Sequence, residues 1–290
     1  MSSLRDVLQQ FRIPFESEGK YSRPGWIQIH CPFCSGGKDP HKLYAGINTS
    51  YGYVNCWRCG YHNLLHTLSV LTGEPKQAVR KILGEVEFDP RPEVERRGLL
   101  KLPEGIGPFA KAHQRYLQGR GFDPEEIETL WGVQGIGIAP KLQWRLFIPI
   151  IHLGETVSWT TRSIGNLGTR YISASPSEEA VNHKELLYGE DYCRYAIIVC
   201  EGPTDVWRIG PGAVATFGTG YRTAQVERMS CYGIRVVCFD NEPDAQARAR
   251  RLCDQLEGYR GETYNVTLSK QDPGQSPKKE IARLRKRFLT

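Results

Sequence analysis

Two pairs of cysteines restrict most narrowly how the N-terminal part of this chain can fold. Cys31 and Cys34 form one C-x2-C motif, and Cys56 and Cys59 form a second one after a spacer of 21 residues. Each motif places two thiolates on one tight turn, and two such turns facing each other supply tetrahedral sulfur ligands for zinc. Four protein ligands leave no open coordination position, so we expect one structural zinc ion.

The residues around these cysteines predict a zinc ribbon. Strand-like segments at 26–29, 43–47 and 51–55 surround the first pair and lead to the second, and leucines at helical spacing follow from Leu64 to Leu71. A module of this size has a small core, so bound zinc, at about 10–16 kcal/mol, would supply much of its stability.

The second cysteine turn carries an aromatic and a basic side chain. Trp57 and Arg58 lie between Cys56 and Cys59. Aromatic rings interleaved with bases can stack on unpaired nucleobases, which predicts nucleic-acid binding at Trp57 and Arg58. The alternative interpretation is that such rings only cover a thin sheet.

The overall composition excludes several classes of protein. The nine cysteines are an odd number, which argues against a complete disulfide framework and favours a reducing cytoplasm. The N-terminus reaches Asp6 without an apolar core, so we expect no signal peptide. No apolar run approaches the ~18–20 residues that span a bilayer, so we expect no membrane partner. The net charge of +6 is compatible with a nucleic-acid partner.

The middle of the chain predicts a linker followed by a small mixed subdomain. Residues 85–108 are charged and contain four prolines with little periodicity, which indicates a tether between domains. Further on, residues 144–151 and 156–162 are typical of adjacent strands. Basic residues recur near these strands and as a set would form a groove for phosphates. They are Arg145, Arg162, Arg170 and Lys184.

The region from residue 195 onward predicts a parallel α/β sheet. Three apolar runs, at 196–200, 213–217 and 235–239, each lead into a polar or glycine-rich turn. Glu201 and Asp240 stand directly at the ends of two of these strands. The carboxyl ends of parallel strands meet at one edge of a sheet, so these side chains should converge.

Further acids lie close to these strand ends: Asp205, Glu242 and, as a weaker candidate, Asp272. Clustered carboxylates repel one another unless a cation lies between them, which predicts Mg²⁺ or Mn²⁺. Two such ions can hold the attacking and leaving oxygens of a phosphoryl displacement. The alternative interpretation is that these acids cap the following helices.

Three motifs in this order resemble the Toprim fold. They are Glu201-Gly202-x-x-Asp205, Gly218-Thr219-Gly220 and Asp240-x-Glu242. The segments before them follow the order found in the core of bacterial DnaG-type primases, and an N-terminal zinc ribbon completes that architecture. These segments are 145–150, 161–163, 170–176 and 184–189.

The resemblance implies a DNA primase that makes short RNA primers on single-stranded DNA by two-metal nucleotidyl transfer during replication. Glu201, Asp240 and Glu242 would be catalytic and would hold Mg²⁺ or Mn²⁺ together with Asp205. Arg145, Arg162, Arg170 and Lys184 would bind template or nucleotide phosphates. The partners would be single-stranded DNA and NTPs, and the zinc ribbon would help to choose the initiation site.

Two departures from the family pattern favour a compact, phage- or plasmid-like form. The usual Asp-x-Asp is Asp240-Asn241-Glu242 here, and Cys34 stands where bacterial members usually carry histidine. The chain contains no G-x-x-x-x-G-K-[ST] motif, so we expect a separate replicative helicase as partner. We expect a cytoplasmic location, in the host cytoplasm if a phage encodes the chain.

Two other functions stay open at this point: a metal-dependent Toprim nuclease and a non-catalytic replication protein that binds single-stranded DNA. The expected fold class is α/β, with a four-cysteine zinc ribbon ahead of a primase core whose Toprim domain has a mostly parallel sheet. The expected divisions are 1–84 (zinc ribbon), 85–108 (linker), 109–194 (N-terminal subdomain of the core), 195–277 (Toprim domain) and 278–290 (basic C-terminal tail).

Overall fold

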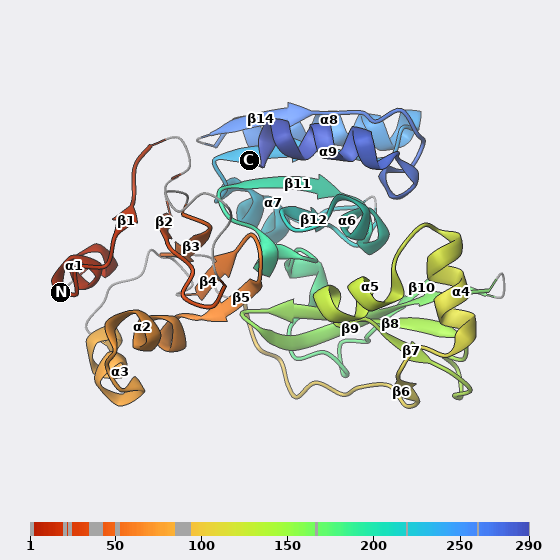
Figure 1. The fold of residues 1–290 in the computed structure, drawn as a ribbon. Coiled ribbons are helices and arrows are strands. Elements are labelled where there is room, and N and C mark those ends of the chain that lie inside the picture. Colours follow the sequence, from red (N-terminus) through yellow and green to blue (C-terminus); the bar gives the residue numbers. More distant parts are fainter. Residues whose placement is uncertain are drawn as a thin grey trace.

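The computed structural model contains three sheets that follow one another along the sequence (Figure 1), one in the ribbon and two in the core. Within the part of the chain that the structure describes, no helix is long and apolar enough to cross a membrane. The predicted turn residue Thr219 and residues 85–93 of the predicted linker lie outside the described part. The structure describes residues 3–19, 22, 25–34, 43–49, 53–84, 94–165, 168–218, 220–259 and 261–289.

The N-terminal sheet is antiparallel in the order β1-β2-β3-β4-β5. Alternate residues of its strands pack with helix residues into one small core, in which Ile27, Ile47, Val54 and Leu68 are buried. The ribbon predicted from the cysteine spacing is therefore confirmed, with two further strands, β1 and β5. Its elements are α1 (Leu4–Gln10), β1 (Phe15–Glu16), β2 (Trp26–Ile29), β3 (Ala45–Asn48), β4 (Tyr53–Cys56), β5 (Gly60–Asn63), α2 (Leu64–Thr72) and α3 (Lys76–Gly84).

The second sheet is antiparallel in the order β10-β9-β8-β7-β6, and its long β8–β9 hairpin is the predicted strand pair. Leu153 and Gly154 turn this hairpin with φ values of 55° and 79°. Positive φ at both positions matches the right-handed twist of a two-residue hairpin. Its elements are β6 (Ile106–Gly107), α4 (Lys111–Gly119), α5 (Pro124–Trp131), β7 (Gln134–Ile136), β8 (Arg145–His152), β9 (Glu155–Ser163) and β10 (Tyr171–Ser173).

Asp191 explains why a leucine is accepted in that hairpin turn. Its buried carboxylate accepts hydrogen bonds from the backbone N–H groups of Leu153 and Gly154, at 3.2 and 2.7 Å. Burial raises the pKa of Asp191 to about 6. The turn of the second sheet is thus fastened to the segment that leads into the third.

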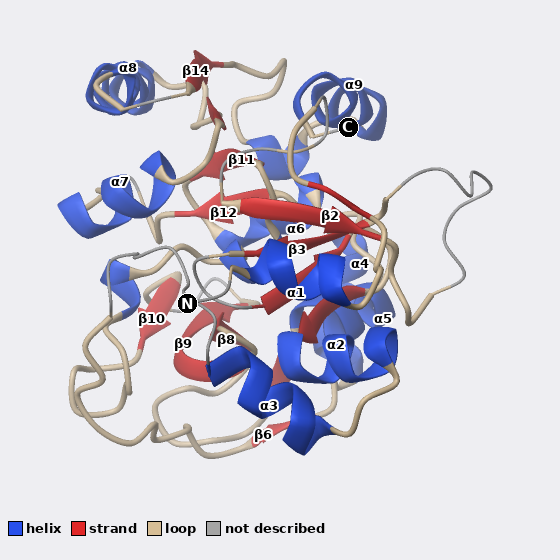
Figure 2. Cartoon of the chain, turned by 90° about the vertical axis from the view of Figure 1, so that its left-hand side faces the viewer, coloured by secondary structure: helices blue, strands red, loops and turns tan. Residues whose placement is uncertain are grey.

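The third sheet is fully parallel in the order β12-β11-β13-β14, which confirms the predicted parallel sheet. Successive side chains of β11 point to opposite faces: Ile198 packs with α6 and α9, whereas Ile197 packs with α7 and α8. Figure 2 shows α7 and α8 on one side of this sheet and α9 on the other. Its elements are β11 (Ala196–Cys200), α6 (Pro203–Ile209), β12 (Ala213–Ala215), α7 (Thr223–Ser230), β13 (Ile234–Val237), α8 (Pro243–Glu257), β14 (Glu262–Asn265) and α9 (Lys278–Phe288).

The segment expected as a basic tail forms helix α9. Ile281, Leu284 and Phe288 are buried on its inner side. Arg285 donates hydrogen bonds to the carbonyl oxygens of Ile209 and Pro211, at 2.6 and 2.8 Å. These contacts hold residues 278–288 against the parallel sheet.

The ribbon packs against the core at Arg194, two residues before β11. The Arg194 guanidinium lies 5.2 Å from the centre of the Trp57 ring and donates a hydrogen bond of 3.4 Å to the carbonyl of Tyr44. Asn55 donates one of 3.4 Å to the carbonyl of Cys193. Burial lowers the pKa of Arg194 to about 9. Beyond this interface, residues 94–108 lie along the second sheet, where the backbone N–H of Lys101 bonds to the carbonyl of Glu178 at 2.8 Å.

Candidate metal and nucleotide site

A cavity of about 190 Å³ opens at the carboxyl ends of the parallel strands. Ligands of open α/β sheets bind at this edge. One wall comes from the third sheet and its turns, and the other from strands β9 and β10 of the second sheet. The lining residues are Thr160, Arg162, Arg170, Tyr171, Ser173, Glu201, Gly202, Pro203, Thr204, Asp205, Phe217, Gly218, Asp240 and Asp272.

Three aspartates form the acidic centre of this cavity. Asp205, Asp240 and Asp272 each offer a carboxylate oxygen, and these oxygens all lie within 4.8 Å of one another. Burial and the neighbouring acids raise the pKa of Asp240 to about 7 and that of Asp205 well above its usual range. Hard oxygen ligands held this close are suited to a divalent cation, which would relieve their repulsion.

Gly274 holds two of these aspartates in place. Its backbone N–H donates to Asp205 at 3.1 Å and to Asp272 at 2.5 Å. A Cβ at this position would lie 2.8 Å from one oxygen of Asp272 and 3.0 Å from one of Asp205. Glycine therefore allows the backbone to approach both carboxylates closely.

The predicted glutamates take different places. Glu201 is buried, lines the cavity and accepts a hydrogen bond of 3.3 Å from the backbone N–H of Asp240. Burial raises the pKa of Glu201. Glu242 is exposed outside the cavity lining, where its carboxylate accepts a hydrogen bond from the Gln271 side chain. The structure thus brings together Glu201, Asp205 and Asp240 in one cavity, and it places the weaker candidate Asp272 in one cluster with Asp205 and Asp240.

The helix-capping alternative applies to two acids, and one of them, Asp272, caps the short turn at Pro273–Gln275 through the backbone N–H of Gly274. Asp205 accepts a hydrogen bond of 3.0 Å from the backbone N–H of Gly202, at the start of α6, and also belongs to the acidic centre. Glu242 precedes α8 without a side-chain capping bond. Capping therefore does not account for the convergence of these groups.

The predicted phosphate-binding bases divide into two kinds. Arg162 and Arg170 line the cavity, and Arg162 donates to the hydroxyl groups of Tyr116, at 2.6 Å, and Tyr171. Arg145 is buried away from the cavity and donates to the carbonyl oxygens of residues 169 and 170, both at 2.8 Å. Arg145 thus holds the turn that presents Arg170.

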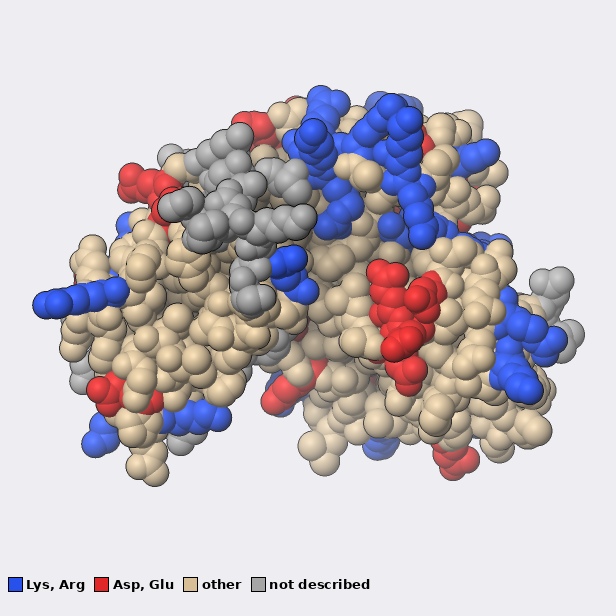
Figure 3. Space-filling model, viewed as in Figure 1, with Lys and Arg blue, Asp and Glu red and all other residues tan. Residues whose placement is uncertain are grey.

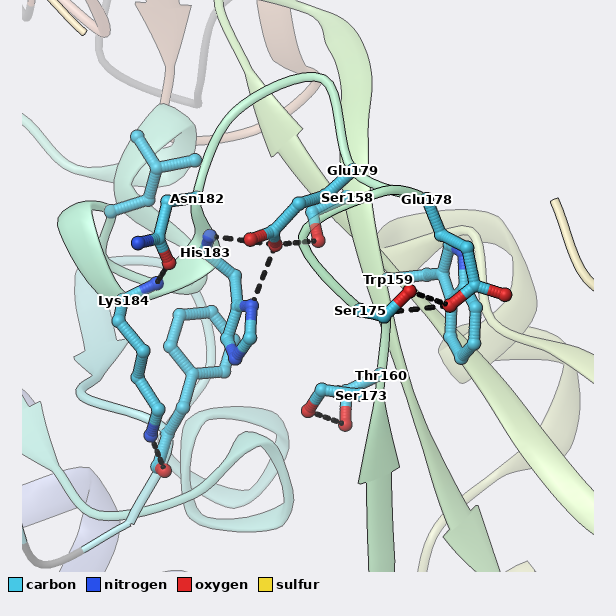
Figure 4. A network of polar contacts seen from close by, with 12 residues as sticks. Ser158, Trp159, Thr160, Ser173, Ser175, Glu178, Glu179, Asn182, His183 and Lys184 are labelled. Atoms are coloured by element: carbon cyan, nitrogen blue, oxygen red, sulfur yellow. Dashed lines mark hydrogen bonds and ion pairs between the residues drawn. The ribbon is translucent and has the colours of Figure 1, made fainter. Parts of the chain in front are cut away.

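Lys184 also contacts backbone instead of lining the cavity. Its ammonium group donates a hydrogen bond of 2.5 Å to the carbonyl of Phe217 (Figure 4). Phe217 has a φ of 62°, a left-handed conformation that bulky residues rarely adopt. Lys184 therefore stabilises the strained turn that forms one wall of the cavity.

A buried glutamate, which the sequence did not point to, fixes the turn that carries Lys184. Glu179 accepts hydrogen bonds from the Ser158 hydroxyl, at 2.9 Å, and from the ring Nδ1 of His183, at 2.7 Å (Figure 4). The His183 ring then meets the Phe217 ring edge-on at 5.4 Å. Burial lowers the pKa of His183.

Arg120 is a second residue that sequence reasoning missed. Its guanidinium lies 3.9 Å from the Asp272 carboxylate. Arg208 holds this region together, because it donates to the carbonyl oxygens of Gly274, at 2.9 Å, and Arg120, at 2.6 Å. The only sequence signal was the Gly119-Arg120-Gly121 turn between two predicted helices.

The four predicted zinc ligands form a tight cluster in the ribbon. The Sγ atoms of Cys31 and Cys59 lie 3.5 Å apart, and those of Cys34 and Cys56 lie 3.7 Å apart. A tetrahedral zinc–thiolate centre with Zn–S bonds of about 2.3 Å requires sulfur–sulfur distances of about 3.8 Å. Burial raises the pKa of the Cys56 thiol to about 11, so a cation is needed to keep it ionised. The cluster therefore supports a structural zinc ion.

The two ribbon residues predicted to contact nucleic acid differ in accessibility. Trp57 is half-buried against Arg194 at the core interface. Arg58 is exposed, with its guanidinium 5.7 Å from the centre of the Tyr44 ring. Stacking on Arg194 occupies one face of the Trp57 ring.

No family model matches the chain, and no curated protein does so either. Among solved structures, the zinc-binding and RNA polymerase domains of Aquifex aeolicus primase are similar over 99% of this chain and 86% of that chain, with 16% identity and a TM-score of 0.54. The DnaG catalytic core is similar over 63% of this chain and 74% of that chain, with 18% identity and a TM-score of 0.52. The E. coli primase catalytic core covers the same shares at 15% identity, also with a TM-score of 0.52. The chain therefore has the fold of the zinc-binding and RNA polymerase domains of DnaG-type primases, as its motifs predicted.

Proposed function

We propose that this protein is a DNA primase that synthesises short RNA primers on single-stranded DNA. The observation that carries the proposal is the cavity in which Asp205, Asp240 and Asp272 face Arg162 and Arg170. Carboxylates that hold divalent metal ions, opposite arginines that bind phosphates, are the two requirements of nucleotidyl transfer. The primase fold supports this assignment at the level of architecture.

In the proposed reaction, the 3′-hydroxyl of one nucleotide attacks the α-phosphorus of the next NTP, and pyrophosphate leaves. Bound divalent ions would supply charge neutralisation at the attacking and leaving oxygens. Asp205, Asp240 and Asp272 would hold these ions, with Glu201 beside them, and their oxygen donors favour Mg²⁺ or Mn²⁺.

The bases of the cavity orient the triphosphate in this proposal. Arg170 is exposed at the cavity and is free to reach phosphate oxygens, whereas Arg162 is oriented by its two tyrosine hydroxyl partners. Arg120, beside Asp272, is suited to the leaving pyrophosphate. Arg145 and Lys184 would act as positioning residues, through residue 170 and Phe217.

We further propose that residues 1–84 act as the zinc-dependent DNA-binding unit, 109–194 as the N-terminal subdomain of the core and 195–277 as the Toprim unit. Arg58 is the ribbon side chain that is best placed to reach the template. Glu242 would act only at the edge of the metal site, through its charge near Asp240. The separate helicase and the cytoplasmic location stay predictions.

Primer synthesis tests the proposal directly. The protein is incubated with mixed single-stranded DNA templates, four NTPs of which one is labelled, and Mg²⁺ or Mn²⁺, and the products are separated on denaturing gels. We expect short labelled RNAs from the wild type, none from Asp240→Asn, and wild-type amounts from Glu257→Gln, which alters an exposed acid of α8.

Two results would replace the proposal. Shortened template without labelled products would indicate a Toprim nuclease, since the same carboxylates could support cleavage of a phosphodiester. Template binding with no products across broad templates and both metal ions would indicate a non-catalytic DNA-binding protein.

A further inference from the structure

Helix α9 presents two chemically different sides. Its inner side is apolar and buried, and its outer side is almost entirely basic. Figure 3 shows lysine and arginine side chains gathered over this helix on the upper part of the molecule. We call this outer side the α9 ridge; its exposed bases are Lys278, Lys279, Arg283, Lys286 and Arg287.

Three bases of the α9 ridge, Lys279, Arg283 and Arg287, have no carboxylate partner among the described residues. Glu280, the one acid of the helix, accepts hydrogen bonds from the backbone and the hydroxyl group of Ser269, at 2.8 and 2.6 Å. The largest group of acids on the same face lies lower, in the region of α5, and smaller acidic patches border the bases at the top (Figure 3).

The α9 ridge starts beside the candidate active site. Asp272, which lines the cavity, lies six residues before Lys278, and only a short turn at Pro273–Gln275 separates them. From there the 11-residue helix runs for about 16 Å. In Figure 1 it runs back from the carboxyl ends of the parallel strands toward the side where the ribbon strands lie. It therefore connects the cavity edge with the ribbon side of the molecule.

The spacing of the bases suits a regular polyanion. Lys279, Arg283 and Arg287 are four residues apart, so they lie on one side of the helix at steps of about 6 Å. A row of bases without intervening acids attracts phosphates regardless of sequence, by releasing their counterions. A protein partner would need an equally regular row of acids.

We propose that the α9 ridge binds the sugar-phosphate backbone of the single-stranded DNA template between the ribbon side and the cavity. This inference rests on the proposed function, because that function places a template at the cavity. It assigns to α9 a role in template affinity and none in the chemical step.

A pair of matched variants tests the α9 ridge. Arg283→Gln/Arg287→Gln removes two exposed charges from α9, and Arg250→Gln/Arg251→Gln removes two exposed charges from α8, on the opposite face of the sheet. The probe is a dye-labelled oligo(dT), and its affinity is measured by fluorescence anisotropy over a series of KCl concentrations.

We expect the α9 pair to make the negative slope of log K against log salt shallower by about 1.4, since each lost phosphate contact on single-stranded DNA contributes about 0.7. The α8 pair should leave the slope at the wild-type value. Circular dichroism of both pairs should match the wild type, because all four side chains are exposed.

Two outcomes would overturn the proposal. Equal loss of affinity in both pairs would mean that net charge alone matters. No loss in either pair would show that the α9 ridge does not bind DNA, and an acidic protein would then be its partner.

Primer synthesis separates this proposal from the proposed function. A wild type that binds DNA with the expected slope but makes no primers refutes only the function. An α9 pair that binds and primes like the wild type refutes only the ridge.

Discussion

The two candidate metal sites of this protein are built in opposite ways. The thiolate site takes its ligands from two short turns of one small module, and the four sulfur atoms surround a single point. The carboxylate site takes its ligands from α6 and from the segments after β13 and β14, and it opens onto a cavity between two sheets. The thiolate site has four protein ligands and so serves to stabilise the fold. The carboxylate site leaves space beside its ligands for a substrate.

The difference also concerns what each site does to stability. In the ribbon, the core is small and the cluster joins strand β4 to the loop after β2. In the third sheet, two large groups of apolar side chains pack on both faces without help from the acids. Removal of metal should therefore unfold the ribbon but leave the parallel sheet folded.

Cys56→Ser should have the largest effect on structure. Loss of one thiolate removes most of a zinc-binding energy of about 10–16 kcal/mol, which the small ribbon core cannot replace. Zinc measured by atomic absorption should fall from one ion per chain to none, and protease should cleave the ribbon. Cys231→Ser, outside the cluster, is the matched control. Full zinc content in Cys56→Ser would contradict the ligand assignment.

Asp240→Asn should abolish activity without unfolding the protein. The amide keeps the shape of the side chain but loses a charged metal ligand, so primer synthesis should fall by about 10³-fold. Thermal unfolding should stay at or above the wild-type temperature, because the variant removes a repelling charge from the acidic centre. An active variant would move the metal site away from Asp240.

Gly274→Ala should weaken the carboxylate site indirectly. The added methyl group would collide with Asp205 and Asp272, which must then move by a few tenths of an ångström. Displaced ligands typically cost about 10–100-fold in metal affinity. Titration with Mn²⁺ would measure this, and Gly258→Ala, at the end of α8, is the control. Unchanged affinity would contradict the role of Gly274 in placing Asp205 and Asp272 for the metal ion.

A change of pH should affect metal binding at the carboxylate site and leave the thiolate site unchanged, and this is the smallest effect that we expect. The pKa of Asp240 is about 7 in the absence of metal, so a proton competes with the cation below that pH. Affinity for Mg²⁺ or Mn²⁺ should thus fall as pH drops through 7, by up to about tenfold per pH unit. Calorimetric titrations from pH 6 to 8.5 would show this fall, while zinc content should stay constant. A pH-independent affinity would exclude Asp240 as the titrating ligand.

Local patterns in the sequence were enough to predict the ribbon and most of the parallel sheet. The spacing of four cysteines fixes a site within one module, and β11 is recognisable as an unbroken apolar run. Strand β14 was not predicted, because it is a polar edge strand of four residues, with exposed Glu262 and Asn265. Asp272 follows that strand, so the sequence supported it only as a weaker candidate for the acidic centre.

The sequence could not distinguish arginines and lysines that face a substrate from those that hold backbone. Arg170 lines the cavity, whereas Arg145 and Lys184 donate hydrogen bonds to backbone carbonyl oxygens. Likewise, Glu242 fits the acidic motif by spacing, but its side chain lies outside the cavity lining and accepts a hydrogen bond from Gln271. Such choices depend on which side of a turn faces which sheet, and this is settled only by tertiary packing.

The contact at Arg194 makes strand β11 a spacer of fixed length. Arg194 touches the ribbon at one end of this strand, and Glu201 reaches the cavity at the other, seven residues later. An extended chain of seven residues spans about 23 Å. Under the proposed function, a nucleotide recognised at the docked ribbon would therefore lie about seven nucleotides from the one being copied, at about 3.4 Å per nucleotide of a stacked strand.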